Sequence, residues 1–148
     1  MTTIEELLEM WTEDAKIDQI EAGEELLKIP RLHSKYLRVL AEATAYARKV
    51  EREYSKARKI MFEYYSGDLN NPDDLERYGF EEPMQRTIIK QNMPMYLDSD
   101  KKLNAILAKK AEAEQIVDAC TSIMKELNSR TYQLRAFIDW EKLNRGAA

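Results

Sequence analysis

Apolar residues recur at alternating spacings of three and four in two long stretches of the chain. In the first stretch the pattern holds over four heptads, which is typical of a helix with one continuous apolar seam. The positions concerned are Tyr36, Leu40, Ala43, Ala47, Val50, Tyr54, Ala57, Met61 and Tyr64. We therefore expect one long helix over residues 31–65, with polar residues on its other faces.

The second stretch repeats this pattern toward the C-terminus, with a single interruption at Lys110. Two long helices joined by a connection most simply pack antiparallel, seam against seam. The sequence therefore predicts a second long helix over residues 99–145, with Asp98 or Ser99 as its N-cap. Its apolar positions are Leu103, Ile106, Ala113, Val117, Cys120, Met124, Leu127, Thr131, Leu134 and Ile138.

The remaining segments predict shorter elements. Thr3 and Glu6 form a capping-box pattern, so a short acidic helix is expected to end near residue 13, and a second to run from about residue 18 toward residue 29. Pro30 then either opens the long helix or kinks a continuous one. Proline, glycine and asparagine cluster between residues 66 and 98, which predicts a connector with short helices near 72–78 and 82–91.

These elements predict an all-α fold: two long amphipathic antiparallel helices with short N-terminal helices and a partly helical connector. We expect one domain over residues 1–148. It comprises acidic N-terminal helices (1–30), a basic long helix (31–65), the connector (66–98) and a C-terminal long helix for self-association (99–145). The four glycines and four prolines of the chain agree with this, because strand-rich folds need many turns.

Catalytic chemistry has no visible basis in the sequence. The single histidine, His33, and the single cysteine, Cys120, are too few for an ordinary zinc site, and Pro30 stands where a Glu-x-x-His motif needs its glutamate. The acid pairs at 73–74 and 81–82 lie in the connector, where solvated carboxylates are the usual finding. We expect a protein that is not an enzyme and has no catalytic residues, no metal and no cofactor.

The N-terminus is acidic, unlike a signal peptide, and no apolar run approaches the roughly 20 residues of a membrane span. The chain is therefore expected to stay in the compartment where it is made.

Charge is distributed in blocks. Residues 31–59 carry nine bases and three acids, whereas residues 1–30 and 60–100 each carry nine acids. A solvated helix face explains the basic block equally simply, but basic side chains interleaved with tyrosines also suit sequence-indifferent binding of single-stranded nucleic acid. The candidate DNA-binding residues are Lys35, Arg38, Arg48, Lys49, Arg52, Lys56, Arg58, Lys59 and Tyr65, with Tyr65 off the seam and so preferred for base stacking.

Several short motifs occur in the order of a known family. They are Ile17-Asp18, Leu32-His33-Ser34-Lys35-Tyr36-Leu37, Glu63-Tyr64-Tyr65-Ser66-Gly67, Glu76-Arg77-Tyr78 and Leu134-Arg135-Ala136-Phe137. In these motifs the chain resembles the UvsY family, the recombination mediators of tailed phages. The family has two basic residues closely before the tyrosine pair. Lys59 matches the first, Met61 departs from the second, and Lys56-Ala57-Arg58 has the right residue types two residues early.

The resemblance implies a non-enzymatic, all-helical protein that binds single-stranded DNA and forms a ring-like homo-oligomer. It implies as partners a UvsX-type recombinase and the phage single-strand-binding protein, and as location the cytoplasm of the infected bacterial host. The C-terminal helix is the expected self-association element, through Leu127, Leu134, Phe137, Ile138 and Trp140. The alternative interpretation is a coiled-coil structural or scaffold protein that binds no nucleic acid.

Overall fold

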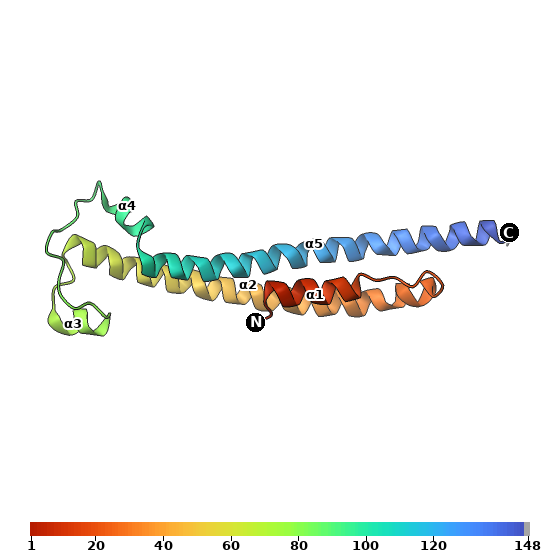
Figure 1. Ribbon diagram of the computed structural model, residues 1–148, viewed down its shortest axis with the longest axis horizontal. Coiled ribbons are helices and arrows are strands. Elements are labelled where there is room, and N and C mark those ends of the chain that lie inside the picture. The colour runs from red at the N-terminus through yellow and green to blue at the C-terminus, as the bar shows by residue number, and fades with distance from the viewer. Residues whose placement is uncertain (147–148) are drawn as a thin grey trace. The chain divides into compact units, whose positions relative to one another are not determined.

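The computed structural model describes residues 1–146 and contains only helices within them (Figure 1). In chain order these are α1 (Ile4–Asp14), α2 (Ala22–Ser66), α3 (Pro72–Arg77), α4 (Met93–Asp98) and α5 (Lys101–Asn144). The all-α class and the two long helices, α2 and α5, are confirmed. No helix of the described residues is long and apolar enough to cross a membrane.

The chain divides into two compact units. Unit 1 contains Met1–Ala45 and Glu112–Ala148, and unit 2 contains Tyr46–Ala111. Each long helix contributes one part to each unit, so each unit has its own apolar core.

Unit 1 is built from α1, the first part of α2 and the second part of α5. Its main core joins Leu7 of α1 to Tyr36 and Ala43 of α2 and to Cys120 and Leu127 of α5. A second cluster packs Ala22 and Ile29 against Leu134. Because earlier residues of α2 meet later residues of α5, the two helices are antiparallel within this unit, as the heptad pattern predicts.

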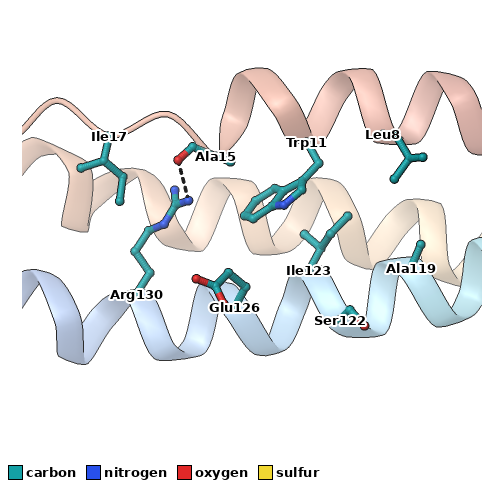
Figure 2. A pocket seen from close by; sticks show the side chains of 9 residues that line it. All are labelled: Leu8, Trp11, Ala15, Ile17, Ala119, Ser122, Ile123, Glu126 and Arg130. Carbon is teal, nitrogen blue, oxygen red and sulfur yellow. Dashed lines mark hydrogen bonds between the residues drawn. The ribbon is translucent and has the colours of Figure 1, made fainter.

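Helix α1 is held at both ends by specific hydrogen bonds. At its start the predicted capping box is present: the Glu6 amide donates to Thr3 Oγ1 (3.2 Å) and the Thr3 amide donates to Glu6 Oε2 (3.0 Å). At its end the buried guanidinium of Arg130 donates to the carbonyl oxygens of Asp14 (3.1 Å) and Ala15 (3.0 Å), which no longer have helical partners. The two Arg130 hydrogen bonds connect the end of α1 to α5, as Figure 2 shows for Ala15.

Helix α2 begins at Ala22 and passes through Pro30, so the continuous helix is the alternative that is present. The start expected at residue 31 is wrong, and the separate helix expected from residue 18 merges with α2. A proline inside a helix removes one backbone hydrogen bond. Here Leu26 and Ile29, which precede the proline, pack in the cluster around Leu134, and Leu32, which follows it, packs against the main core of unit 1. This packing keeps the helix continuous across the missing bond.

Unit 2 contains the rest of α2, the connector and the start of α5. Met61, Met93, Leu97 and Leu103 form its core. The helix predicted near 72–78 is present as α3, with the Asn71 side chain accepting from the Asp73 amide (2.9 Å). The helix expected near 82–91 is absent.

Part of this segment is irregular chain that is hydrogen-bonded to α2. The Ile88 amide donates to the Tyr65 carbonyl (2.9 Å), so residue 88 pairs with the end of α2, and the next helix, α4, begins only at Met93.

The N-cap of α5 also differs from the prediction. Asp100 Oδ1 accepts from the Leu103 amide (2.9 Å), whereas the Ser99 hydroxyl donates back to the Met95 carbonyl (2.8 Å) and Asp98 is the last residue of α4.

Candidate nucleic-acid interface

Six basic candidates of unit 2 lie on α2, and most of them are on the face of this helix that points away from the core. At about 100° per residue, five of them fall within an arc of roughly 100°, centred opposite the seam of Val50, Ala57 and Met61. These five form the basic stripe: Arg48, Lys49, Arg52, Lys56 and Lys59, all exposed. From the first to the last the stripe is about 16 Å long, using roughly 1.5 Å of rise per residue.

Most of the stripe has no anionic partner. Within residues 1–146, no salt bridge involves Arg48, Lys49, Arg52 or Lys56. Lys59 Nζ lies 4.0 Å from Glu63 Oε1, but its side chain is 78% exposed, and such pairs contribute little. The charge of the stripe is therefore directed to solvent, where an anionic ligand can approach it.

One neighbouring acid is drawn away from the stripe. Glu51 Oε1 lies 3.5 Å from Lys110 Nζ of α5, within the same unit. Arg58 is exposed but lies on the flank of α2, roughly 80° from Arg48 at the edge of the stripe. Five of the six basic candidates in unit 2 thus share one face.

Lys35 and Arg38 lie on the part of α2 that belongs to unit 1. Lys35 Nζ lies 2.6 Å from Asp14 Oδ2, and the same oxygen accepts the hydroxyl of Tyr36 (2.7 Å). Burial alone would raise the pKa of Asp14, but the hydrogen bonds from Lys35 and Tyr36 outweigh it and lower this pKa. Lys35 therefore helps to hold the end of α1, and Arg38 is exposed on α2.

Tyr65 is partly buried and has a structural partner. Its hydroxyl donates to Asp100 Oδ2 (2.7 Å), the carboxylate that caps α5, and its ring meets those of Tyr64 and Tyr96. Burial, then this hydrogen bond, raises the pKa of Tyr65 well above its ordinary value. Position off the seam suggested a ring free to stack on bases; the structure instead gives this tyrosine a role in joining α2 to α5.

Tyr64 has a similar role in the connector. Its ring stacks on Phe80, with centroids 3.9 Å apart and planes within 5°, and its hydroxyl donates to the Glu82 carbonyl (3.2 Å). After the tyrosine pair the chain turns at Gly67, whose φ of +84° favours glycine. The Tyr-Tyr-Ser-Gly motif therefore ends α2 and holds the connector against the end of this helix.

The residues expected to mediate self-association fall into two groups. Leu127 and Leu134 are buried in the cores of unit 1, and Phe137 and Ile138 pack partly against the Leu134 cluster. These side chains stabilise the protomer itself. Trp140 is different, because 59% of it is exposed, and Tyr132 and Leu143 are also exposed on the same helix.

The single cysteine and histidine are not part of a ligand cluster. Cys120 is buried in the main core of unit 1, where burial raises the pKa of its thiol, and His33 is half-buried. No group of three or more His, Cys, Asp or Glu side chains positioned to hold a metal ion occurs among residues 1–146.

Comparison with known proteins places the chain in a family. The family model described as "Recombination, repair and ssDNA binding protein UvsY" matches residues 10–147. No curated protein sequence matches the chain.

Among solved structures, the recombination mediator protein UvsY of bacteriophage T4, lattice type II, has a TM-score of 0.85 and 21% identity, covering 98% of this chain and 99% of that chain. Its lattice type I structure has a TM-score of 0.82 and 20% identity, covering 93% and 98%. At these identities the structural likeness shows a common fold. The family match over nearly the whole length shows that this chain belongs to the UvsY family.

Proposed function

We propose that this protein is a non-enzymatic recombination mediator that binds single-stranded DNA through the basic stripe of α2. The observation that carries the proposal is the stripe itself: five exposed cations on one helix face, four of them without an anionic partner in residues 1–146. The family description includes single-stranded DNA binding, which supports the assignment of phosphate as the ligand. Basic grooves and stripes that follow a backbone bind strands without reading sequence.

A single stripe about 16 Å long contacts few phosphates, so assembly matters for affinity. We propose that protomers associate into a ring-like homo-oligomer, in which several stripes bind one strand. Linked sites raise the overall affinity through a high effective concentration, without any new contact.

The mediator step is an exchange of proteins on the strand. A UvsX-type recombinase replaces the single-strand-binding protein that coats the DNA, and this protein favours the exchange by holding the strand in a form that the recombinase binds better. A ligand shifts such an equilibrium only by its differential affinity for the two states, so no nucleotide hydrolysis by the mediator is needed.

Fluorescence anisotropy of a labelled oligonucleotide tests the DNA-binding part of the proposal. We expect salt-sensitive binding that is tighter for single-stranded than for duplex DNA and indifferent to sequence. No binding at low salt would refute this part and favour the scaffold interpretation. The exchange step is tested by recombinase assembly on DNA coated with single-strand-binding protein, where adding this protein should shorten the lag; an unchanged lag would refute it.

A further inference from the structure

Phe62 is an exposed aromatic residue at the end of the basic stripe on α2. It is 36% exposed. It lies three residues after Lys59 and four after Arg58, so the three side chains are neighbours on the helix surface. At about 100° per residue, its position around the helix axis falls between these two cations, roughly 60° from Lys59 and 40° from Arg58. The ring therefore stands beside the last cation of the stripe.

The Phe62 ring has no partner inside the protomer. Its neighbour Met61 is buried in the core of unit 2, whereas Phe62 is not among the side chains that form or cover this core. Within residues 1–146, the Phe62 ring meets no other aromatic ring and no cation. It is the one exposed aromatic residue that α2 has in unit 2, because the other four are partly buried: Tyr46, Tyr54, Tyr64 and Tyr65.

Aromatic rings elsewhere in the fold are held by partners. In unit 1, Trp11 meets Tyr36 edge-on, with ring centroids 5.7 Å apart. The Arg130 guanidinium lies 5.3 Å from the centre of the Trp11 ring, and Figure 2 shows the two side by side. In unit 2, Tyr65 is held by its hydrogen bond to Asp100. Tyr65 was the ring expected to stack on bases, and this contact leaves that role to another side chain.

The surface around Phe62 is polar and basic. One turn away on the same side of α2 lie Arg58, Lys59 and Ser66, and two turns before it lies Ser55. Arg58 forms no salt bridge within residues 1–146. The buried centre of a protein–protein interface is apolar and depleted in charge, so a single ring among cations and hydroxyl groups does not suit one. An exposed ring beside exposed cations is instead what proteins present to single-stranded nucleic acid.

Cations alone do not explain a preference for single strands. Duplex DNA has the denser charge, with one phosphate for about every 1.7 Å of its axis, so a row of cations attracts a duplex at least as strongly. A preference for the single strand needs a contact with the bases. Every unpaired base offers a flat face to an aromatic ring, and the ring reads no sequence. In a duplex these faces are covered by the neighbouring base pairs.

We propose that a base of single-stranded DNA stacks on Phe62 while the basic stripe holds the phosphates. This inference rests on the DNA binding proposed above and adds the contact that distinguishes a single strand from a duplex. It assigns the stacking role to a ring that follows the stripe on the same helix. A strand lying along the stripe therefore reaches Phe62 without leaving α2.

The test compares two labelled strands of equal length and equal phosphate number. One is an oligothymidine, and the other carries abasic sites in place of all its bases. Fluorescence anisotropy measures the affinity of the full chain for each strand at several salt concentrations. The wild type should bind the oligothymidine at least about fivefold more tightly, which is the lower end of the contribution of one stacked base.

Phe62→Leu keeps an apolar side chain of similar size and removes the ring. Its affinity for the oligothymidine should fall to within about twofold of that for the abasic strand, since only phosphate contacts remain. Its affinity for the abasic strand and its salt dependence should match the wild type. Phe62→Trp keeps an aromatic face and should retain the preference for bases. The matched control is Tyr78→Leu, which removes a comparably exposed ring (37%) from the connector of the same unit and should behave as the wild type.

Two further measurements exclude an indirect effect. Far-UV circular dichroism verifies the helical content of each variant, and sedimentation verifies its assembly size, because a change in valency alters the affinity for both strands. An equal loss of affinity for both strands in Phe62→Leu, with a smaller assembly, would assign the ring to a contact between protomers and overturn the proposal.

The remaining outcomes separate stacking from phosphate binding. If the wild type binds both strands equally, or if Phe62→Leu keeps the full preference for the oligothymidine, stacking on Phe62 is refuted and the basic stripe is unaffected. If the wild type binds neither strand at low salt, the stacking role and the DNA binding of the stripe are refuted together.

Discussion

Substituting Tyr65 with phenylalanine tests the structural role that its hydroxyl has in unit 2. Phenylalanine keeps the ring but removes the hydrogen bond to Asp100 Oδ2. A hydrogen bond to a charged group contributes about 1.5–3 kcal/mol, and Asp100 is buried, so its second oxygen would lose its protein donor. We expect Tyr65→Phe to lower the free energy of unfolding by about 2 kcal/mol.

The assay is urea unfolding followed by far-UV circular dichroism at one fixed protein concentration, since self-association couples stability to concentration. The matched control is Tyr96→Phe, because the Tyr96 hydroxyl makes no hydrogen bond within residues 1–146. Its effect should stay within about 0.5 kcal/mol. Equal stability of Tyr65→Phe and the wild type would refute the assigned role.

The same variant changes the response to alkali. Burial and the Asp100 carboxylate raise the pKa of Tyr65 above 10.0, so the folded protein keeps a proton that the unfolded chain releases. The stabilisation is complete below pH 10 and is lost as the pH rises above it. Tyr36, buried and bonded to Asp14, behaves in the same way. Above pH 10, Tyr65→Phe should lose stability less steeply, by up to about 1.4 kcal/mol per pH unit; parallel curves would contradict this.

Three further substitutions test the packing of unit 1 and of α2. Asp14→Asn should flatten the loss of stability below pH 4 in acid unfolding curves, because the lowered pKa of Asp14 gives stability that is present above the ordinary carboxyl pKa of 3.8 and lost as the pH falls; an unchanged acid limb would contradict this. Leu127→Ala should cost about 2–5 kcal/mol in urea unfolding, since the side chain is fully buried, and a cost under 1 kcal/mol would place Leu127 outside the core. Pro30→Ala should stabilise the protein by roughly 2 kcal/mol, as a helical hydrogen bond is restored at some cost in unfolded-state entropy; destabilisation would show that the helix needs the proline.

The long helices were predictable because heptad spacing is a local signal. The choice between a helix that begins at Pro30 and one that continues through it was not predictable, because it depends on packing against Leu134, more than a hundred residues away. The helix predicted near residues 82–91 is absent for a related reason: the Ile88 amide donates to the backbone carbonyl of Tyr65, a contact that the local sequence does not specify.

For the candidate site, too, the features set by local spacing were predictable and the contacts between distant residues were not. Exposure of the basic stripe follows from its position opposite the seam, which the sequence specifies. The ion pair of Lys35 with Asp14 and the hydrogen bond of Tyr65 with Asp100 join residues 21 and 35 positions apart, and no spacing rule identifies them.

The self-association residues could have been assigned better from the sequence. Leu127 and Leu134 are seam positions, so their burial within the protomer was the direct consequence of the heptad pattern. Tyr132, Trp140 and Leu143 lie off the seam but share a helical spacing of their own. That second periodicity is the sequence signal of an apolar face that the protomer leaves exposed.

The most direct test of the central claim is the salt dependence of single-stranded DNA binding by stripe variants. Arg52→Ala with Lys56→Ala removes two cations of the stripe, and Lys101→Ala with Lys109→Ala removes two exposed lysines of α5 in the same unit. Anisotropy titrations over a range of salt give the slope of log affinity against log salt. For the stripe variant this slope should be shallower by about 1.4 per protomer in contact, at roughly 0.7 per phosphate contact, with the control unchanged. Identical slopes for the wild type and the stripe variant would contradict the claim that the stripe binds DNA.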